Sequence, residues 1–172
     1  MVEMHRNDGE CVVPGETPED FSAQALQLYL SKIELSWNRW IAALDQLDDD
    51  QIVASGTCGD WSVKDMIGHV AVWDEVAIEK TESILSSANR QPPAESLDAF
   101  NDRTWKAFRD RSLSDLKDWM VETHARMIVA IRNAIGATNE QRERLEYATV
   151  DDTWKHYDTH REQVVARFGV SA

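Results

Sequence analysis

The sequence is poor in residues that interrupt helices or cross-link a chain. It has 172 residues with only four prolines and seven glycines, so long stretches contain no helix breaker. Cys11 and Cys58 are its two cysteines, which are too few for a disulfide framework, and no C-x-x-C pair offers a zinc or redox site. The sequence therefore predicts a mostly helical protein that does not depend on disulfide bonds.

Long hydrophobic runs and basic residues are also scarce. No apolar segment approaches the length of a membrane span, and none follows the first methionine as in a signal peptide. Lysine and arginine number 18 against 31 aspartates and glutamates, which gives a formal net charge of −13. Because nucleic acids and anionic membranes attract basic surfaces, this charge argues against both partners. We expect a cytoplasmic protein.

Apolar residues recur instead at the 3.6-residue period of amphipathic helices. Thr17 and Pro18 form a helix start, and the apolar stripe that follows predicts a helix over residues 18–48. Ser62, with Asp65 three residues later, forms a capping box for a second helix. The pattern breaks after this helix, and residues 86–111 are expected to cross the bundle with one short helix.

Two more helices are expected in the second half of the chain. Ser112 or Ser114 caps the third, which Gly136 ends. Residues 137–150 are highly charged and predict a loop. A fourth helix is capped by Asp151 or Asp152 and ends at Gly169. Four apolar-striped helices predict a single all-α domain over residues 17–172, a four-helix bundle, after a flexible N-terminal arm of residues 1–16.

Histidines on these helices are the candidate site. His156 and His160 are four residues apart, a spacing that points both imidazoles toward one spot on a helix. His69 lies in the apolar stripe of the second helix and can converge with them. Three imidazoles leave a divalent metal with an open position for water or substrate, which is typical of a catalytic site. Zinc, nickel and iron all suit such ligands, so the ion stays open.

Other histidines and other chemistries fit less well. His124 also faces inward from the third helix, and we interpret it as a packed core histidine rather than a ligand. Asp158 and Glu162 would point away from the two histidines beside them, so neither is assigned as a general base. The sequence has no G-x-S-x-G motif, phosphate loop or dinucleotide fingerprint.

Two segments carry a family resemblance. Residues 61–73 (WSVKDMIGHVAVW) resemble the W-S-x-K-D-x-x-x-H-[LV]-x-x-W signature of the DinB-like superfamily. Residues 156–164 (HYDTHREQV) resemble its closing H-x-x-x-H-x-x-Q-[IVL] segment. Phe100 with Asn101, and residues 109–112, are similar to its middle region, so the resemblance covers about residues 20–168.

The resemblance implies an up-down-down-up bundle whose metal is bound by three histidines, here His69, His156 and His160. Relatives include bacillithiol S-transferases, mycothiol-dependent maleylpyruvate isomerase and the colibactin self-resistance hydrolase. It therefore implies an enzyme that directs a metal-bound low-molecular-weight thiol or water at a small electrophile, by S-transfer, hydrolysis or isomerisation. Many relatives pair, so a homodimer is plausible here.

A second hypothesis stays open beside the enzyme. The chain would then be a non-catalytic bundle that binds a small molecule or a protein, with the metal structural or absent. An open coordination position and a pocket favour the enzyme, whereas histidines satisfied by other side chains favour the binder.

Overall fold

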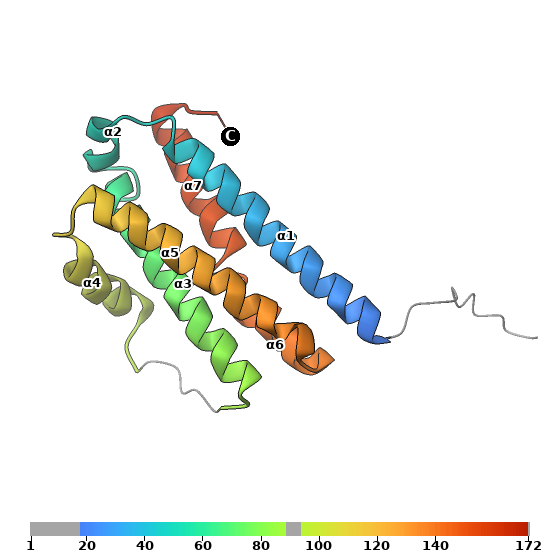
Figure 1. Ribbon diagram of the computed structural model, residues 1–172. Coiled ribbons are helices and arrows are strands. Elements are labelled where there is room, and N and C mark those ends of the chain that lie inside the picture. Colours follow the sequence, from blue (N-terminus) through green and yellow to red (C-terminus); the bar gives the residue numbers. More distant parts are fainter. Residues whose placement is uncertain (1–17, 89–93, 172) are drawn as a thin grey trace, which may run out of the picture.

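The computed structural model describes residues 18–88 and 94–171, which are almost entirely helical (Figure 1). None of these residues forms a β-strand; one isolated bridge joins Cys58 and Trp61. The elements in order are α1 (Pro18–Leu44), α2 (Asp49–Val53), α3 (Val63–Leu85), α4 (Leu97–Phe108), α5 (Leu113–Arg132), the 3₁₀ turn η1 (Asn133–Gly136), α6 (Asn139–Thr149) and α7 (Trp154–Phe168). The all-α prediction is confirmed. The predicted arm, residues 1–16, lies outside the described residues.

The four long helices α1, α3, α5 and α7 form the bundle. Figure 1 shows that α1 and α7 run in one direction, and that α3 and α5 run side by side in the other. This is the expected up-down-down-up order. The segment between α3 and α5 carries the short helix α4, so the predicted crossover is confirmed as well.

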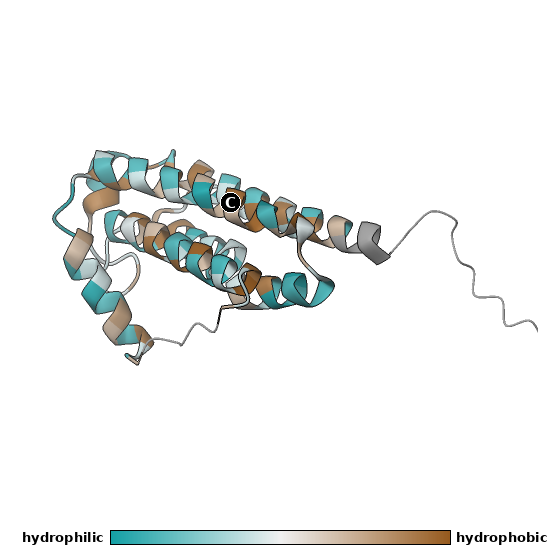
Figure 2. Ribbon diagram, turned by 60° about the horizontal axis from the view of Figure 1, so that its bottom comes forward, coloured by the Kyte–Doolittle hydropathy of each residue, from teal (hydrophilic) through white to brown (hydrophobic). Residues whose placement is uncertain are grey.

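Packing divides the bundle into two layers. Helices α1 and α7 pack on each other and form one layer, and α3 and α5 form the other. The two layers are in contact less extensively, through α3 with α7 and α1 with α5. Figure 2 shows hydrophobic and hydrophilic residues mixed along each long helix, as in amphipathic helices. The largest fully buried side chains include Tyr29, Ile33, Trp40, Met66, Ile67, Leu116, Met120, Met127 and Tyr157.

Local capping explains where several helices begin and end. The Ser62 side chain accepts a hydrogen bond from the Asp65 backbone while the Asp65 carboxylate accepts one from the Ser62 backbone, which is the predicted capping box. Ser112 caps α5 by accepting from the Asp115 backbone. Gly169 ends α7 with φ of 67°, a left-handed conformation that favours glycine.

Three sequence predictions about local structure are wrong. The first helix ends at Leu44 rather than at residue 48, because Asp48 starts the separate helix α2 with Gln51 as its capping partner. Residues 137–150 are mostly helix α6, not a loop. Thr138 and Gln141 form its capping box, but of its residues only Leu145 and Thr149 are buried, so its apolar period is weak.

The predicted cap of the fourth helix is the third error. Neither Asp151 nor Asp152 caps α7. The N-cap position is held by Thr153, whose side chain makes no capping hydrogen bond. Asp152 is buried and accepts a 2.6 Å hydrogen bond from the Lys80 ammonium instead. A tertiary ion pair therefore overrides the local capping preference.

Helix α4 is fastened across the beginning of α3. The Trp105 indole donates a 2.7 Å hydrogen bond to Asp65, and the Lys64 ammonium donates to the Arg109 carbonyl. Phe108 packs directly on Gly68, where a side chain larger than hydrogen would collide with its ring. This places α4 beside the histidine-bearing part of α3.

No helix in the described part of the chain is long and apolar enough to cross a membrane.

Candidate metal centre

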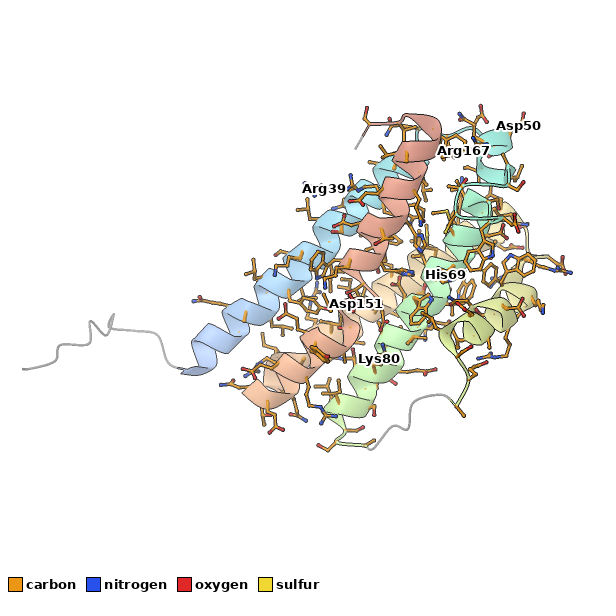
Figure 3. All side chains as sticks on the ribbon, turned by 180° about the vertical axis from the view of Figure 1, so that it is seen from behind. Arg39, Asp50, His69, Lys80, Asp151 and Arg167 are labelled. Carbon is orange, nitrogen blue, oxygen red and sulfur yellow. The ribbon has the colours of Figure 1, made fainter. Side chains whose placement is uncertain are left out.

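His69, His156 and His160 lie together on the line where α3 meets α7. Figure 3 shows His69 on α3, and its imidazole lies against those of α7. The Nε2 atoms of His69 and His156 are 3.1 Å apart, and those of His156 and His160 are 2.9 Å apart. All three residues offer a ligand atom within 4.8 Å of the others. The convergence expected from the sequence is therefore present.

These distances fit a small divalent ion. With Zn–N bonds of 2.0–2.1 Å in a tetrahedral site, two ligand nitrogens lie roughly 3.3 Å apart. The measured separations of 2.9 and 3.1 Å are close to this value, with Nε2 as the ligand atom of each ring. This spacing suits one metal ion held by the three histidines, whose ligand atoms all lie within 4.8 Å of one another.

The protonation states of the three imidazoles also favour a metal. Burial, with a smaller contribution from His160, lowers the pKa of His69 to about 3. Burial lowers the pKa of His156 well below its usual range, and the neighbouring His160 and His69 lower it further. Burial lowers the pKa of His160 as well, against an opposing hydrogen bond with Gln163. All three rings are thus neutral near pH 7, the form that ligates metals.

Gln163 orients one of the three rings. Its side-chain oxygen lies 2.8 Å from Nδ1 of His160, one helical turn along α7. Because that oxygen accepts a hydrogen bond, Nδ1 carries the proton and Nε2 keeps a free lone pair. His69 and His156 have no hydrogen-bond partner at Nδ1 among the described residues, although both atoms are buried. Sequence reasoning quoted Gln163 in a motif but gave it no role.

Aromatic rings surround the three histidines. Trp61 and Trp73 meet His69 edge-on, with ring centroids 4.9 and 6.1 Å away. Trp73 also lies 5.9 Å from His156, and Phe100 of α4 lies 5.3 Å from Trp73. Trp61 is held by a tight turn in which its backbone pairs with Cys58. These rings lower the local polarity and strengthen electrostatic interactions at the site.

His124 stands apart from this group, as the sequence interpretation expected. Its ring stacks on Trp37 of α1 with centroids 3.7 Å apart and planes 4° apart. Its Nδ1 lies 3.2 Å from the hydroxyl of Tyr157, and that hydroxyl donates a 2.5 Å hydrogen bond to Asp74. His124 is therefore a core histidine in a buried polar cluster.

Asp74 is the residue of this cluster that sequence reasoning missed. It is fully buried and occupies an inward position of α3, four residues after Val70. A carboxylate in the middle of an apolar stripe is itself the signal that could have found it, because buried acids are rare unless they are paired.

The acids beside the α7 histidines point elsewhere, as predicted. Asp158 accepts a 3.2 Å hydrogen bond from Ser36 of α1, and Glu162 is exposed. Within the described chain, no aspartate or glutamate belongs to the group that includes the three histidines.

Comparison with known protein families agrees with this arrangement. The model of the DinB superfamily matches residues 32–164. This range is most of the chain and contains all three histidines. No curated protein and no solved structure matches the chain significantly.

Proposed function

Since the chain belongs to the DinB superfamily, we propose that its three converging histidines hold a divalent metal ion and that the protein is a metal-dependent enzyme. The observation that carries the proposal is the meeting of three neutral imidazole Nε2 atoms at one point between α3 and α7. In this proposal His69, His156 and His160 are the ligands. The substrate is a small electrophile, and a low-molecular-weight thiol or a water molecule is the nucleophile.

The donor set determines what the site can supply. A divalent ion bound by three protein ligands keeps a position for a thiol or water and lowers the pKa of either toward neutrality. Three imidazoles are neutral, so they leave the full charge of the ion to act on that group, unlike a set containing carboxylates. Imidazole suits zinc, nickel and iron, and the proposal includes all three.

The surrounding residues would orient the ligands and exclude water. Gln163 holds the His160 ring with its Nε2 lone pair toward the other two histidines. Trp61 and Trp73 cover the ring of His69, which keeps solvent from one side of the group. The chemistry therefore takes place against apolar walls, where a bound nucleophile is less hydrated than in water.

A cleft between α3, α4 and α5 is the proposed site for the electrophile. It has a volume of about 460 Å³ and is lined by apolar and charged residues. Phe100 lines this cleft, and its ring also contacts Trp73, which in turn meets His69 and His156. The rings of Phe100 and Trp73 thus lie between the cleft and the histidines, so the proposal requires these two side chains to move before an electrophile in the cleft reaches the metal.

One observation supports a second candidate function. The Nε2 separations of 2.9 and 3.1 Å are also the lengths of hydrogen bonds between imidazoles. A bundle whose histidines satisfy one another in this way would bind a small molecule or a protein without a catalytic metal. Metal content separates the two functions.

The test is the metal content of protein purified without a metal-affinity column or a chelator. Elemental mass spectrometry should find about one equivalent of zinc, nickel or iron per chain, and His156→Ala should lose it. His124→Gln is the matched control, since it changes a buried histidine outside the group and should retain the metal.

If wild-type protein holds no metal even after reconstitution, the second function replaces the first. If metal is present, thiol consumption in the presence of an activated electrophile tests for S-transfer, and hydrolysis without added thiol tests for water as the nucleophile.

A further inference from the structure

A carboxyl group is completely buried in the bundle core, on the same helix as His69. Asp74 has no exposed surface, and its Oδ2 has no hydrogen-bond partner among the described residues. Burial raises the pKa of Asp74 well above its usual range, against the Tyr157 hydroxyl that stabilises the ionised form. Because burying such a group costs free energy, its position in the core calls for a specific partner.

That partner is a cluster with one member from each long helix. Asp74 of α3 accepts the hydroxyl of Tyr157 of α7, and Nδ1 of His124 of α5 lies 3.2 Å from the same hydroxyl. Trp37 of α1 stacks on His124 and meets Tyr157 edge-on, with centroids 5.4 Å apart. The tyrosine hydroxyl is therefore held from both sides, and it links the two layers of the bundle.

The link joins the two helices that carry the histidine group. Tyr157 directly follows His156 and precedes His160 by three residues, while Asp74 is five residues after His69 on α3. The Tyr157–Asp74 hydrogen bond thus lies within about one and a half helical turns of the ligands on each helix. Any rotation of α7 about its axis that moves the Tyr157 hydroxyl also moves His156 and His160.

Helix α7 is fixed against α1 by contacts that include the hydrogen bond from Ser36 to Asp158, whereas its contacts with α3 are few. Its N-terminus has no side-chain cap, and the helix packs more closely on α1 than on α3. A direct contact between α7 and α3 is therefore needed to fix how far the α7 imidazoles stand from His69.

We infer that Tyr157, anchored by Asp74, is a positioning residue for the histidine group: its hydroxyl fixes the rotation of α7 and so presets the distance of His156 and His160 from His69. The inference rests on the proposed metal binding. With the hydrogen bond, the site exists before the ion arrives. Without it, part of the binding free energy is used to bring α7 into place.

The first variant for the test is Tyr157→Phe, which removes the hydroxyl and keeps the ring. The dissociation constant for zinc, measured by competition with a chromophoric chelator, should rise about 10-fold to 100-fold, the range seen when groups that orient metal ligands are removed. The visible spectrum of the cobalt-substituted protein should change in intensity, because the ligand geometry relaxes.

Thr81→Val is the matched control. Thr81 is buried on α3, and its hydroxyl donates only within its own helix, to the Ala77 carbonyl. This variant should lower the melting temperature, while the zinc dissociation constant and the cobalt spectrum stay as in the wild type. A loss of general stability is thereby separated from a loss of ligand positioning.

Asp74→Leu tests the same bond from the other side, because it removes the acceptor of the Tyr157 hydroxyl, and it serves if Tyr157→Phe does not fold. It should weaken zinc binding in the same range, and the two substitutions combined should weaken it by less than the product of their separate effects. Wild-type affinity and an unchanged cobalt spectrum in folded Tyr157→Phe or Asp74→Leu would overturn the inference and leave the proposed metal site standing. Failure of the wild type itself to bind metal would instead overturn the proposed function, and the inference with it.

Discussion

Two regions of the bundle each bury histidine, and they use it differently. In the group formed by His69, His156 and His160 the rings meet edge-on, with their Nε2 atoms turned toward one another. In the cluster around His124 the ring lies flat on Trp37 and bonds to a tyrosine. The first arrangement brings lone pairs together, whereas the second pairs the imidazole with a tyrosine hydroxyl that in turn bonds to Asp74.

Burial and protonation do not distinguish the two regions. Burial lowers the pKa of His69 to about 3 and that of His124 to about 4, so both are neutral near pH 7. The distinguishing feature is the partner of each ring nitrogen. A candidate metal ligand in a helical bundle is therefore best identified by converging nitrogens rather than by a shifted pKa.

The largest expected difference between the two regions is the effect of replacing a histidine on the stability gained from zinc. Saturating zinc should raise the free energy of unfolding of the wild type by about 4 kcal/mol at a thousandfold excess over the dissociation constant. His160→Ala should abolish that gain, whereas His124→Gln should keep it although the variant is less stable without metal. Thermal melts with and without zinc measure both. An equal zinc response in the wild type and His160→Ala would contradict the site.

Acid should act on both regions when metal is absent. Both His69 and His124 stay neutral in the folded protein down to about pH 3 and 4, whereas in the unfolded chain they take up a proton near their ordinary value of 6.5. The unfolded state thus binds more protons between these limits. Stability should therefore fall as the pH falls below 6.5, by up to about 1.4 kcal/mol per pH unit for each histidine.

The pH dependence of the stability gained from zinc tests the imidazole ligands directly. Protons compete with the ion for the ligands, so the zinc-dependent part of the stability should vanish toward low pH in the wild type and in His124→Gln alike. Chemical denaturation from pH 7 to pH 4, with and without zinc, checks this. A zinc-dependent gain that is constant over this range would argue against imidazole ligands.

Asp74 should respond to pH in the opposite sense. Its pKa is raised in the fold, so the folded state holds the proton more tightly than the unfolded chain, and stability from this group is lost as the pH rises. Asp74→Asn removes this titration. The free energy of unfolding of the variant, relative to that of the wild type, should therefore be higher at pH 8 than at pH 4. Chemical denaturation at both pH values measures it. The reverse order would mean that the carboxylate form is the one the fold stabilises.

Gln163→Leu should have an intermediate effect confined to the metal region. It leaves the Nδ1 proton of His160 buried without an acceptor, at a cost of about 1–3 kcal/mol in folding stability. The ring also loses its fixed orientation, so zinc affinity should fall about tenfold. Gln163→Glu, which retains an acceptor, should bind zinc more tightly than Gln163→Leu in the same competition assay.

Trp37→Phe should have the smallest effect, and it should appear only in the other region. It reduces the stacked area over His124 and should lower the free energy of unfolding by about 0.5–1.5 kcal/mol. Zinc affinity should stay within a factor of about two of the wild type. A loss of affinity as large as that of Gln163→Leu would show that the two regions are more tightly coupled than their separate contacts indicate.

Much of the local structure was predictable because it depends on neighbours in the sequence. The capping box of Ser62 and Asp65, the cap at Ser112 and the left-handed Gly169 all follow from short-range chemistry. The helix α6 escaped prediction because few of its residues are buried, although Thr138 and Gln141 carried the same capping signal. Local signals were therefore more reliable than hydrophobic period for this short, exposed helix.

The site was predictable only in part. The four-residue spacing of His156 and His160 and the place of His69 in an apolar stripe indicated that the three could meet, and the structure brings them together. The roles of Gln163 and Asp74 were not predicted. The role of Gln163 depends on which nitrogen of His160 carries the proton. The role of Asp74 depends on contact with Tyr157, which is 83 positions away in the sequence.

The sequence alone determined the four long helices, several of their ends and most of the residues that face inward, because capping and amphipathic period act over one or two turns. The tertiary structure alone decided which inward residues touch. Pairing α1 with α7 and α3 with α5 brings the Nε2 atoms of His69, His156 and His160 together on one side and stacks His124 on Trp37 elsewhere. Contacts between helices depend on how their surfaces pack in space, and no single stretch of sequence contains that information.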